Sequence, residues 1–284
     1  MLILLTNDDG VYAPGLAAMQ RQLARLGEVY LIAPATEQSG VGHSITYLKP
    51  LTVKEVCDGD VRWGWAVEGS PADCVKLGIT EVCPRRPDLV VSGINSGLNA
   101  GINVLYSGTV AAAIEGAFFG INSVAVSLQF DEHARFDKAA HLARDVIEQL
   151  LRQKASRAQL YNLNIPTAAL GGKPEVDVVP MDVTPHGDRY ERRVDPWGRE
   201  YFWAAGGPPP GPGSHETDLS ALAKGRVTLT PLHYDMTERA ALAEMMHWQF
   251  DLSEAVAEEG DPDDAYRRPV MRPSRKRHRV AADD

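Results

Sequence analysis

Apolar and polar residues follow two different periods in the first 165 residues of the chain. Short runs that are almost wholly apolar are typical of strands buried on both faces, and they alternate with longer segments that have a helical period. The predicted strands are residues 2–6, 29–33, 88–93, 123–127 and 158–165, and the predicted helices are residues 14–26, 70–82, 107–119 and 136–153. A hairpin is also expected around Asp58-Gly59. This pattern predicts an α/β fold with a doubly wound, mainly parallel, Rossmann-like sheet.

The alternation of strands and helices weakens after Pro166. The elements expected beyond it are a β-rich segment (176–204) with a turn at Trp197-Gly198, a Pro-rich loop (206–213), a short return strand (227–231) and a late helix (237–258). We therefore divide the chain into an α/β core (1–170), a β-rich extension with a return strand and a C-terminal helix (171–258), and a disordered Arg-rich tail (259–284).

Composition and charge restrict the class of protein. The chain has 284 residues, of which 44% are hydrophobic, and its net charge of −9 argues against binding nucleic acid through the whole surface. Its three cysteines form no C-x-x-C pair, so neither a disulfide framework nor a zinc cluster is expected. No basic leader precedes the first strand, and no apolar run reaches the roughly 18 residues of a membrane span. We expect a soluble, reduced, cytoplasmic protein with no membrane partner.

Two adjacent carboxylates, Asp8 and Asp9, follow the first predicted strand in the sequence Asn7-Asp8-Asp9-Gly10. Ligands of open parallel sheets bind at the carboxyl ends of the strands, which is where this pair is expected. Neighbouring carboxylates repel each other and are costly to desolvate, and a hard divalent cation relieves both costs. The same four residues are also typical of a turn that caps the next helix. Spacing alone leaves both interpretations open.

Three further loops are expected at the same edge of the sheet. One contains Asn95 and Asn99, which offer amide contacts between glycines that allow close approach of a ligand. Ser107-Gly108-Thr109 opens a helix, where its hydroxyl and N–H groups could hold a phosphate or where Ser107 simply caps the helix. The third loop contains Ser39, a candidate oxygen ligand, and His43, either a proton carrier or an ordinary surface residue. Together the loops favour metal-assisted hydrolysis of a phosphomonoester.

A series of motifs occurs in a recognisable order along the chain. They are Leu4-Leu5-Thr6-Asn7-Asp8-Asp9-Gly10, Ala13-Pro14-Gly15, Ala33-Pro34, Gln38-Ser39-Gly40, Ser92-Gly93-Ile94-Asn95 with Gly97, Asn99 and Gly101, Tyr106-Ser107-Gly108-Thr109-Val110, Asn162-Leu163-Asn164-Ile165-Pro166, Thr217-Asp218 and Thr230-Pro231-Leu232. In this order they resemble the SurE (survival protein E) family of 5′/3′-nucleotidases over roughly residues 1–240. The Pro-rich loop and the Arg-rich tail depart from the family pattern, and they bear on oligomer geometry and substrate access rather than on chemistry. Spacing alone suggests no role for Thr217-Asp218 or Thr230-Pro231-Leu232.

The resemblance implies a divalent-metal-dependent phosphatase that hydrolyses nucleoside 5′- and 3′-monophosphates to nucleoside and phosphate. It implies one Mg²⁺ or Mn²⁺ per subunit, and its ligands would be Asp8, Asp9, Ser39 and Asn95. The phosphate would be held by Asn99, Ser107, Gly108 and Thr109. Asp8 and Asp9 would be the catalytic residues, with Asp9 acting as base or as nucleophile. The family's swapped C-terminal segment implies a homodimer or a homotetramer.

Other functions fit parts of the sequence. A metal-dependent deacetylase also has an Asp-Asp pair at a strand end, but its zinc needs histidine ligands and no histidine lies near Asp8 in the sequence. Haloacid-dehalogenase phosphatases need Asp-x-Asp, which is absent at this strand end. A non-catalytic nucleotide-binding regulatory module would hold the phosphate without hydrolysing it. The basic segment 267–279 is either a solvated tail or an arm for polyanions such as polyphosphate or RNA ends.

Overall fold

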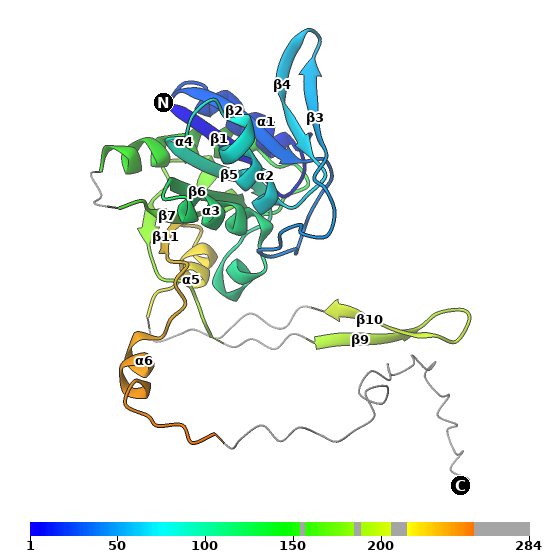
Figure 1. Cartoon of the computed structure of the whole chain (residues 1–284). Helices are drawn as coiled ribbons and strands as arrows, with labels where there is room; N and C mark the ends of the chain where they lie inside the picture. The colour runs from blue at the N-terminus through cyan, green and yellow to red at the C-terminus, as the bar shows by residue number, and fades with distance from the viewer. Residues whose placement is uncertain (154–156, 185–188, 206–214, 253–284) are drawn as a thin grey trace. The chain divides into compact units, whose positions relative to one another are not determined.

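The computed structural model in Figure 1 describes residues 1–153, 157–184, 189–205 and 215–252. The chain packs as two compact units, Met1–Asp235 and a second unit that begins at Met236. The predicted Pro-rich loop at 206–213 and the Arg-rich tail at 259–284 lie outside the described residues.

The larger unit is built on a nine-stranded sheet with the order β3-β4-β2-β1-β5-β6-β7-β11-β8. Its strands are β1 (Leu2–Thr6), β2 (Glu28–Pro34), β3 (Val53–Asp58), β4 (Val61–Val67), β5 (Leu89–Ser96), β6 (Asn122–Leu128), β7 (Leu160–Ile165), β8 (Val176–Val178) and β11 (Val227–Leu232). The strands from β4 across to β7 are parallel, whereas β3 and β11 run antiparallel to β4 and β7. The predicted doubly wound, mainly parallel sheet is therefore confirmed.

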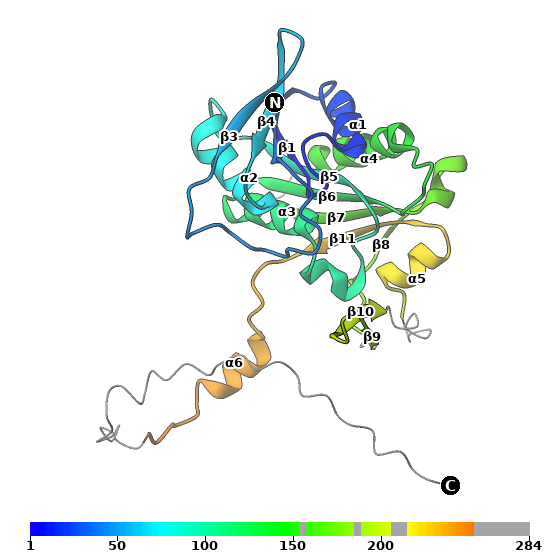
Figure 2. The ribbon, with the colours of Figure 1, turned by 90° about the vertical axis from the view of Figure 1, so that its right-hand side faces the viewer.

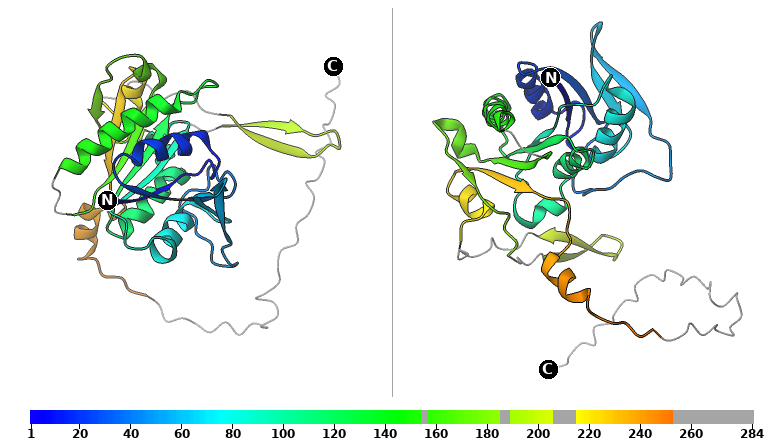
Figure 3. Two further views of the ribbon diagram at one scale, coloured as in Figure 1. Left: turned by 90° about the horizontal axis from the view of Figure 1, so that it is seen from above. Right: turned by 60° about the vertical axis from the view of Figure 1, so that its left-hand side comes forward.

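Helices cover both faces of this sheet, as Figures 2 and 3 show. The helices α1 (Pro14–Leu23) and α4 (Phe136–Arg152) pack on one face, and α2 (Pro71–Leu77) and α3 (Gly108–Phe118) pack on the other. Successive side chains of a strand point to opposite faces, so Ile3 and Leu5 of β1 join the core under α1 and α4 while Leu4 joins the core under α2. This explains why β1 is apolar at consecutive positions.

One predicted helix ends earlier than expected, and another changes its helical type before its predicted end. The helix expected over 14–26 ends at Leu23, and the helix expected over 70–82 ends as α2 at Leu77 and continues as one π-helical turn, Gly78–Val82. Ser107 is not the first residue of α3 but its N-cap, because its Oγ accepts the N–H of Val110 at 3.1 Å. Two short 3₁₀ segments, Gly101–Leu105 and Thr167–Gly171, complete the connections.

The β-rich extension is confirmed. The sequence pattern did not predict the short helix that follows it, α5 (Asp218–Ala223). β9 (Arg189–Val194) and β10 (Glu200–Ala205) form an antiparallel hairpin whose turn contains Gly198 at φ +80°. The additional helix α5 (Asp218–Ala223) is only six residues long and begins with a capping box formed by Thr217 and Ser220. Although they follow residue 170, β8 and β11 are part of the same sheet as the core strands.

The late helix predicted over 237–258 is present but shorter than expected in its described part. The helix α6 (Arg239–Met245) ends at Met245, and residues 248–252 have no helical structure. None of the α6 residues is buried, and a short helix without a packed face is only marginally stable in water. Residues 253–258 lie outside the described residues. Within the part of the chain that the structure describes, no helix is both long and apolar enough to cross a membrane.

Candidate active site at the β1–β5 edge

The carboxyl ends of β1 and β5 form the point where the chain order of the sheet reverses. β2 lies on one side of β1 and β5 on the other, so the loops that follow β1 and β5 diverge here. The turn after β1 is held by the side-chain amide of Asn7, which donates to the carbonyl of Gly10 at 3.0 Å. Gly10 has φ +99°, a conformation that favours glycine. The turn therefore fixes Asp8 and Asp9 at this edge.

Asp8 lies against the first turn of α3. It is 5% exposed, and its Oδ1 accepts a hydrogen bond of 2.5 Å from the hydroxyl of Thr109. A Cβ on Gly108 would lie 3.0 Å from Cβ of Asp8 and 3.1 Å from its Oδ2, so a larger residue there would press on Asp8. Burial raises the pKa of Asp8, and the hydrogen bonds from Thr109 only partly oppose that rise. The helix start predicted as a phosphate cradle thus lies directly beside the carboxylate pair.

Asp9 connects the turn after β1 to the end of β5. Its Oδ2 accepts the backbone N–H of Ser96 at 3.0 Å. Burial, followed by the negative charge of Asp8, raises the pKa of Asp9 to about 6, and Glu37 contributes in the same direction. Three acidic side chains therefore act on one small region, which favours a cation there.

Asn95 lies near the end of β5, at the same edge. Its side-chain nitrogen donates to the carbonyl of Gly97 at 2.8 Å, so Oδ1 remains as the atom that could bind a cation. The pairing of β5 with β6 shifts register between Ser92 and Asn95. Gly93, within this shift, has φ +133°, and a Cβ there would lie 2.2 Å from the carbonyl oxygen of Val126. This irregularity changes the direction of the last residues of β5.

Ser39 reaches the edge on the loop after β2. The backbone N–H of the preceding residue, Gln38, donates to the carbonyl of Asp8 at 2.8 Å. The hydroxyl of Ser39 is exposed and donates to Oε1 of Glu37 at 2.6 Å, which leaves its lone pairs free to bind a cation. The backbone contact joins the third predicted loop to the carboxylate pair.

The predicted phosphate-binding residues fall into two groups. Ser107, Gly108 and Thr109 form the first turn of α3 beside Asp8. Asn99 is buried, and its side-chain nitrogen donates to Ser127 Oγ at 2.8 Å, with Thr109 Oγ1 at 3.4 Å. In this structure the side chain of Asn99 therefore contacts the hydroxyl of Thr109 and helps to hold it in place, a role that the sequence pattern did not suggest.

A buried polar network that sequence reasoning missed supports the Asn99 loop. The side-chain amides of Asn162 and Asn164 on β7 both donate to the carbonyl of Asn99, at 2.7 and 3.0 Å. Asp218, at the start of α5, accepts the N–H groups of Gly101 and Asp182, both at 2.8 Å. Asn at alternate positions of an otherwise apolar strand was the available signal, since buried polar groups need partners.

The donor set fits a hard divalent cation. Asp8, Asp9, Ser39 and Asn95 would offer only oxygen atoms, which Mg²⁺ and Mn²⁺ prefer. No cluster of three or more His, Cys, Asp or Glu side chains able to hold a metal occurs in residues 1–153, 157–184, 189–205 or 215–252. A site of two carboxylates completed by neutral oxygens is consistent with that result.

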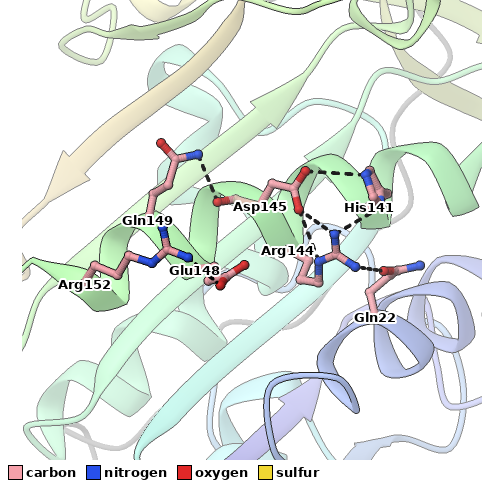
Figure 4. Close-up of polar contacts among 7 residues, drawn as sticks. All are labelled: Gln22, His141, Arg144, Asp145, Glu148, Gln149 and Arg152. Atoms are coloured by element: carbon pink, nitrogen blue, oxygen red, sulfur yellow. Dashed lines mark hydrogen bonds and ion pairs between the residues drawn. The ribbon is translucent and has the colours of Figure 1, made fainter.

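Surface hollows lie away from this edge. One of about 920 Å³ lies beside α4, and Figure 4 shows the polar face of α4 that borders it. There Arg144 donates to Gln22 at 2.8 Å and forms an ion pair with Asp145 at 2.6 Å. These contacts join α4 to α1 on a partly solvated face and bring no second group of site residues together, so volume alone does not locate the chemistry.

Comparisons with known proteins show the family to which this chain is similar. The model of the family described as Survival protein SurE matches residues 3–193. A 5′-nucleotidase SurE from Rhodopirellula baltica is 61% identical over 249 residues, covering 87% of this chain and 98% of the relative. A 5′-nucleotidase SurE from Desulforudis audaxviator is 44% identical over 258 residues, covering 88% and 98%.

A solved structure gives the same result. The crystal structure of a SurE protein from Aquifex aeolicus superposes with a TM-score of 0.76 at 35% identity, covering 86% of this chain and 98% of that chain. The family match covers more than half of the chain, and its relatives are matched over nearly their whole length. The chain therefore belongs to the SurE family.

Proposed function

We propose that the protein is a 5′-nucleotidase that hydrolyses nucleoside monophosphates to nucleoside and phosphate. Relatives that are 61% and 44% identical are named 5′-nucleotidase SurE. The observation that carries the proposal is the pair of the buried Asp8 and the partly buried Asp9 at the switch point of the sheet, with the first turn of α3 against Asp8. Activity on 3′-monophosphates is part of the proposal.

The proposed activity depends on one divalent cation per subunit, Mg²⁺ or Mn²⁺. Asp8, Asp9, Ser39 and Asn95 would hold it, and the acidic character of this edge supports that assignment. When bound, the cation would neutralise charge that develops on the phosphate oxygens.

The chain's own groups would bind and orient the phosphate. The N–H groups at the start of α3, around Ser107 to Thr109, offer donors and the positive end of the helix dipole. Asn99 would keep Thr109 in place, and Thr109 in turn orients Asp8. Asp9 is the proposed base for the attacking water. A phosphorylated Asp9 trapped by rapid acid quench would instead identify it as the nucleophile.

Two alternatives have less support. A deacetylase-like zinc site would need histidine ligands. His43, the histidine singled out in the nearby loop, is hydrogen-bonded to Glu115 at 2.9 Å. A nucleotide-binding module without catalysis would need the same phosphate contacts, and only an assay separates it from the enzyme.

We propose further that the protein is a cytoplasmic homodimer or homotetramer. Exposed aromatic residues on the β9–β10 hairpin, among them Tyr190, Phe202 and Trp203, and the lack of buried residues in α6 support an oligomer. Light scattering on a sizing column measures the subunit number, and a monomer at micromolar concentration would contradict this part of the proposal. We also propose, from charge alone, that the basic segment 267–279 binds polyphosphate or RNA ends as additional substrates.

Phosphate release tests the proposed function. The purified protein is incubated with 5′-AMP or 3′-AMP after EDTA treatment, and then with added Mg²⁺, Mn²⁺ or Zn²⁺. We expect no release with EDTA and recovery with Mg²⁺ or Mn²⁺ on both substrates. Recovery with Zn²⁺ alone would favour the deacetylase-like alternative, and AMP binding without release would favour the regulatory module.

A further inference from the structure

The loop that carries Ser39, residues 35–52, contains no helix or strand. Its shape therefore depends on bonds to the rest of the larger unit. Two backbone bonds lie on either side of Ser39, because Gln38 N–H donates to Asp8 at 2.8 Å and Gly42 N–H donates to Tyr106 at 3.0 Å. Only three residues separate Gln38 from Gly42, so the position of Ser39 is restricted as long as the bond at Gly42 is formed.

The residue after Gly42 is tied to a buried carboxylate. Nε2 of His43 lies 2.9 Å from Oε2 of Glu115, whose side chain is only 5% exposed in the middle of α3. The ring of His43 also stacks on Phe118, with centroids 5.5 Å apart and planes 20° apart. His43 thus contacts α3 through both an edge and a face.

Glu115 is an ionised anchor rather than a neutral one. Burial acts to raise the pKa of Glu115, but the hydrogen bond with His43 and the charge of Lys76 bring that pKa below its usual value. Lys76 Nζ lies 3.4 Å from the other carboxylate oxygen, Oε1. A hydrogen bond to an ionised acceptor is stronger than one between neutral groups.

A second buried carboxylate fixes the loop farther along. Asp73 is 3% exposed and accepts both the backbone N–H of Thr46 at 3.0 Å and its hydroxyl at 2.7 Å. Ser70 Oγ donates to the carbonyl of Ser44 at 2.6 Å. Because Asp73 also caps α2 by accepting the N–H of Ser70, its removal would disturb the helix as well as the loop.

We propose that Glu115 is a positioning residue for the metal site: through His43 it fixes the segment 38–46, and so holds Ser39 next to the backbone bond that joins Gln38 to Asp8. The assignment rests on the metal-dependent function proposed above. It gives Glu115, which the relatives' names and the sequence motifs leave without a role, a specific action on one ligand.

The test compares exposed variants that leave the core of α3 intact. His43→Ala removes the tie, and His43→Gln places an amide nitrogen where Nε2 lies and should restore it. Lys76→Met is the matched control, since Lys76 contacts Glu115 but belongs to α2 rather than to the loop. Each variant is studied as the full chain, alone and in the Ser39→Ala background.

Two readouts separate positioning from stability. Hydrogen exchange of the peptide spanning 38–46 should be about tenfold faster in His43→Ala, the effect of losing roughly one hydrogen bond, with little change in Tm. The Kd for Mn²⁺, measured by calorimetry without substrate, should rise about tenfold. His43→Gln and Lys76→Met should stay within about twofold of the unmodified chain in both measurements.

The double variant decides whether the tie acts through Ser39. We expect Ser39→Ala with His43→Ala to bind Mn²⁺ no more weakly than Ser39→Ala alone. Additive losses, or unchanged exchange and unchanged Mn²⁺ affinity in His43→Ala, would overturn the proposal. Asp8→Asn separates the two proposals: if it abolishes Mn²⁺ binding while His43→Ala changes nothing, only the positioning role fails. If the unmodified chain binds no Mn²⁺, the metal-dependent function fails and the positioning role fails with it.

Discussion

The hydroxyl of Thr109 donates a 2.5 Å hydrogen bond to Oδ1 of Asp8, joining the first turn of α3 to the turn after β1. Asp8 is thereby held from a position 101 residues away in the sequence. A carboxylate with one oxygen fixed in this way keeps the other, Oδ2, in a defined direction. The bond links the two groups that the proposed function requires, the cation ligands and the phosphate-binding turn.

Thr109→Val should lower kcat/KM for 5′-AMP by about 10- to 100-fold, because the variant keeps the volume of the side chain but loses a hydrogen bond to a charged group. Thr109→Ser keeps the hydroxyl and should retain most of the activity. Steady-state phosphate release at saturating Mn²⁺ measures both variants, and inhibition by inorganic phosphate should weaken in parallel in Thr109→Val. Equal kcat/KM values for Val and Ser would show that the bond to Asp8 has no part in the reaction.

Gly108→Ala should lower phosphate release, because the new Cβ would lie 3.0 Å from Cβ of Asp8 and 3.2 Å from Cγ of Pro71 and would displace Asp8. Helix propensity acts in the opposite direction, since Ala favours a helix over Gly by about 1 kcal/mol. Gly171→Ala is the matched control, because a Cβ there meets nothing within 4 Å. A fully active Gly108→Ala protein would mean that the contact between α3 and Asp8 is looser than the structure shows.

Asp218→Asn should destabilise the protein by about 1.5–3 kcal/mol, since hydrogen bonds to charged groups contribute that much and Asp218 accepts the N–H groups of Gly101 and Asp182. It should also lower phosphate release, because Gly101 ends the loop that carries Asn99. Urea unfolding gives the change in the free energy of unfolding, and the assay is run well below the midpoint. A loss of stability with unchanged kcat/KM would separate α5 from the site.

Asp88 gives the stability a defined pH dependence. The hydrogen bond from Arg85, followed by the N–H of Leu2, lowers the pKa of Asp88 to about 2. Because the pKa is lower in the folded state than the unfolded value of about 4, the stabilisation is present above pH 4 and is lost as the pH falls through 2. Solvent screens this exposed pair, so Asp88→Asn should cost only about 1 kcal/mol at pH 7.

Denaturant unfolding of the Asp88→Asn variant and the unmodified chain at pH 7, 4 and 3 tests this expectation. The difference in the free energy of unfolding should shrink between pH 4 and pH 3. A difference that stays constant over that range would mean that the carboxylate charge of Asp88 contributes nothing to stability.

The sequence predicted those parts of the site that adjacent residues define. Asp8 and Asp9 are neighbours after an apolar run, and Ser107-Gly108-Thr109 opens a predicted helix, so local pattern was enough to place them at the edge of the sheet. The parallel sheet followed from the same alternation. The ligand assignments themselves, including Ser39 and Asn95, stay predictions until metal binding is measured.

What the sequence did not predict depends on contacts between distant residues. Asn99 meets Asn164 from 65 residues away, and the pairing of Glu115 with His43 spans 72 residues. The end of the last helix was also misplaced. The pattern of 237–258 is helical, but it does not reveal that no residue of α6 is buried. The short helix α5 depends on the capping box of Thr217, which carries little hydrophobic signal.

The most direct test of the proposed function is phosphate release from 5′-AMP by the unmodified chain, Asp8→Asn and Asp9→Asn at saturating Mn²⁺. Asp60→Asn, at an exposed carboxylate in the β3–β4 turn, is the control for loss of charge alone. We predict that Asp8→Asn and Asp9→Asn lose at least about 100-fold in kcat while they keep their fold, because each removes a charge from the catalytic edge. Asp60→Asn should be unaffected. Near-normal kcat in both Asp8→Asn and Asp9→Asn would contradict the assignment of the active site.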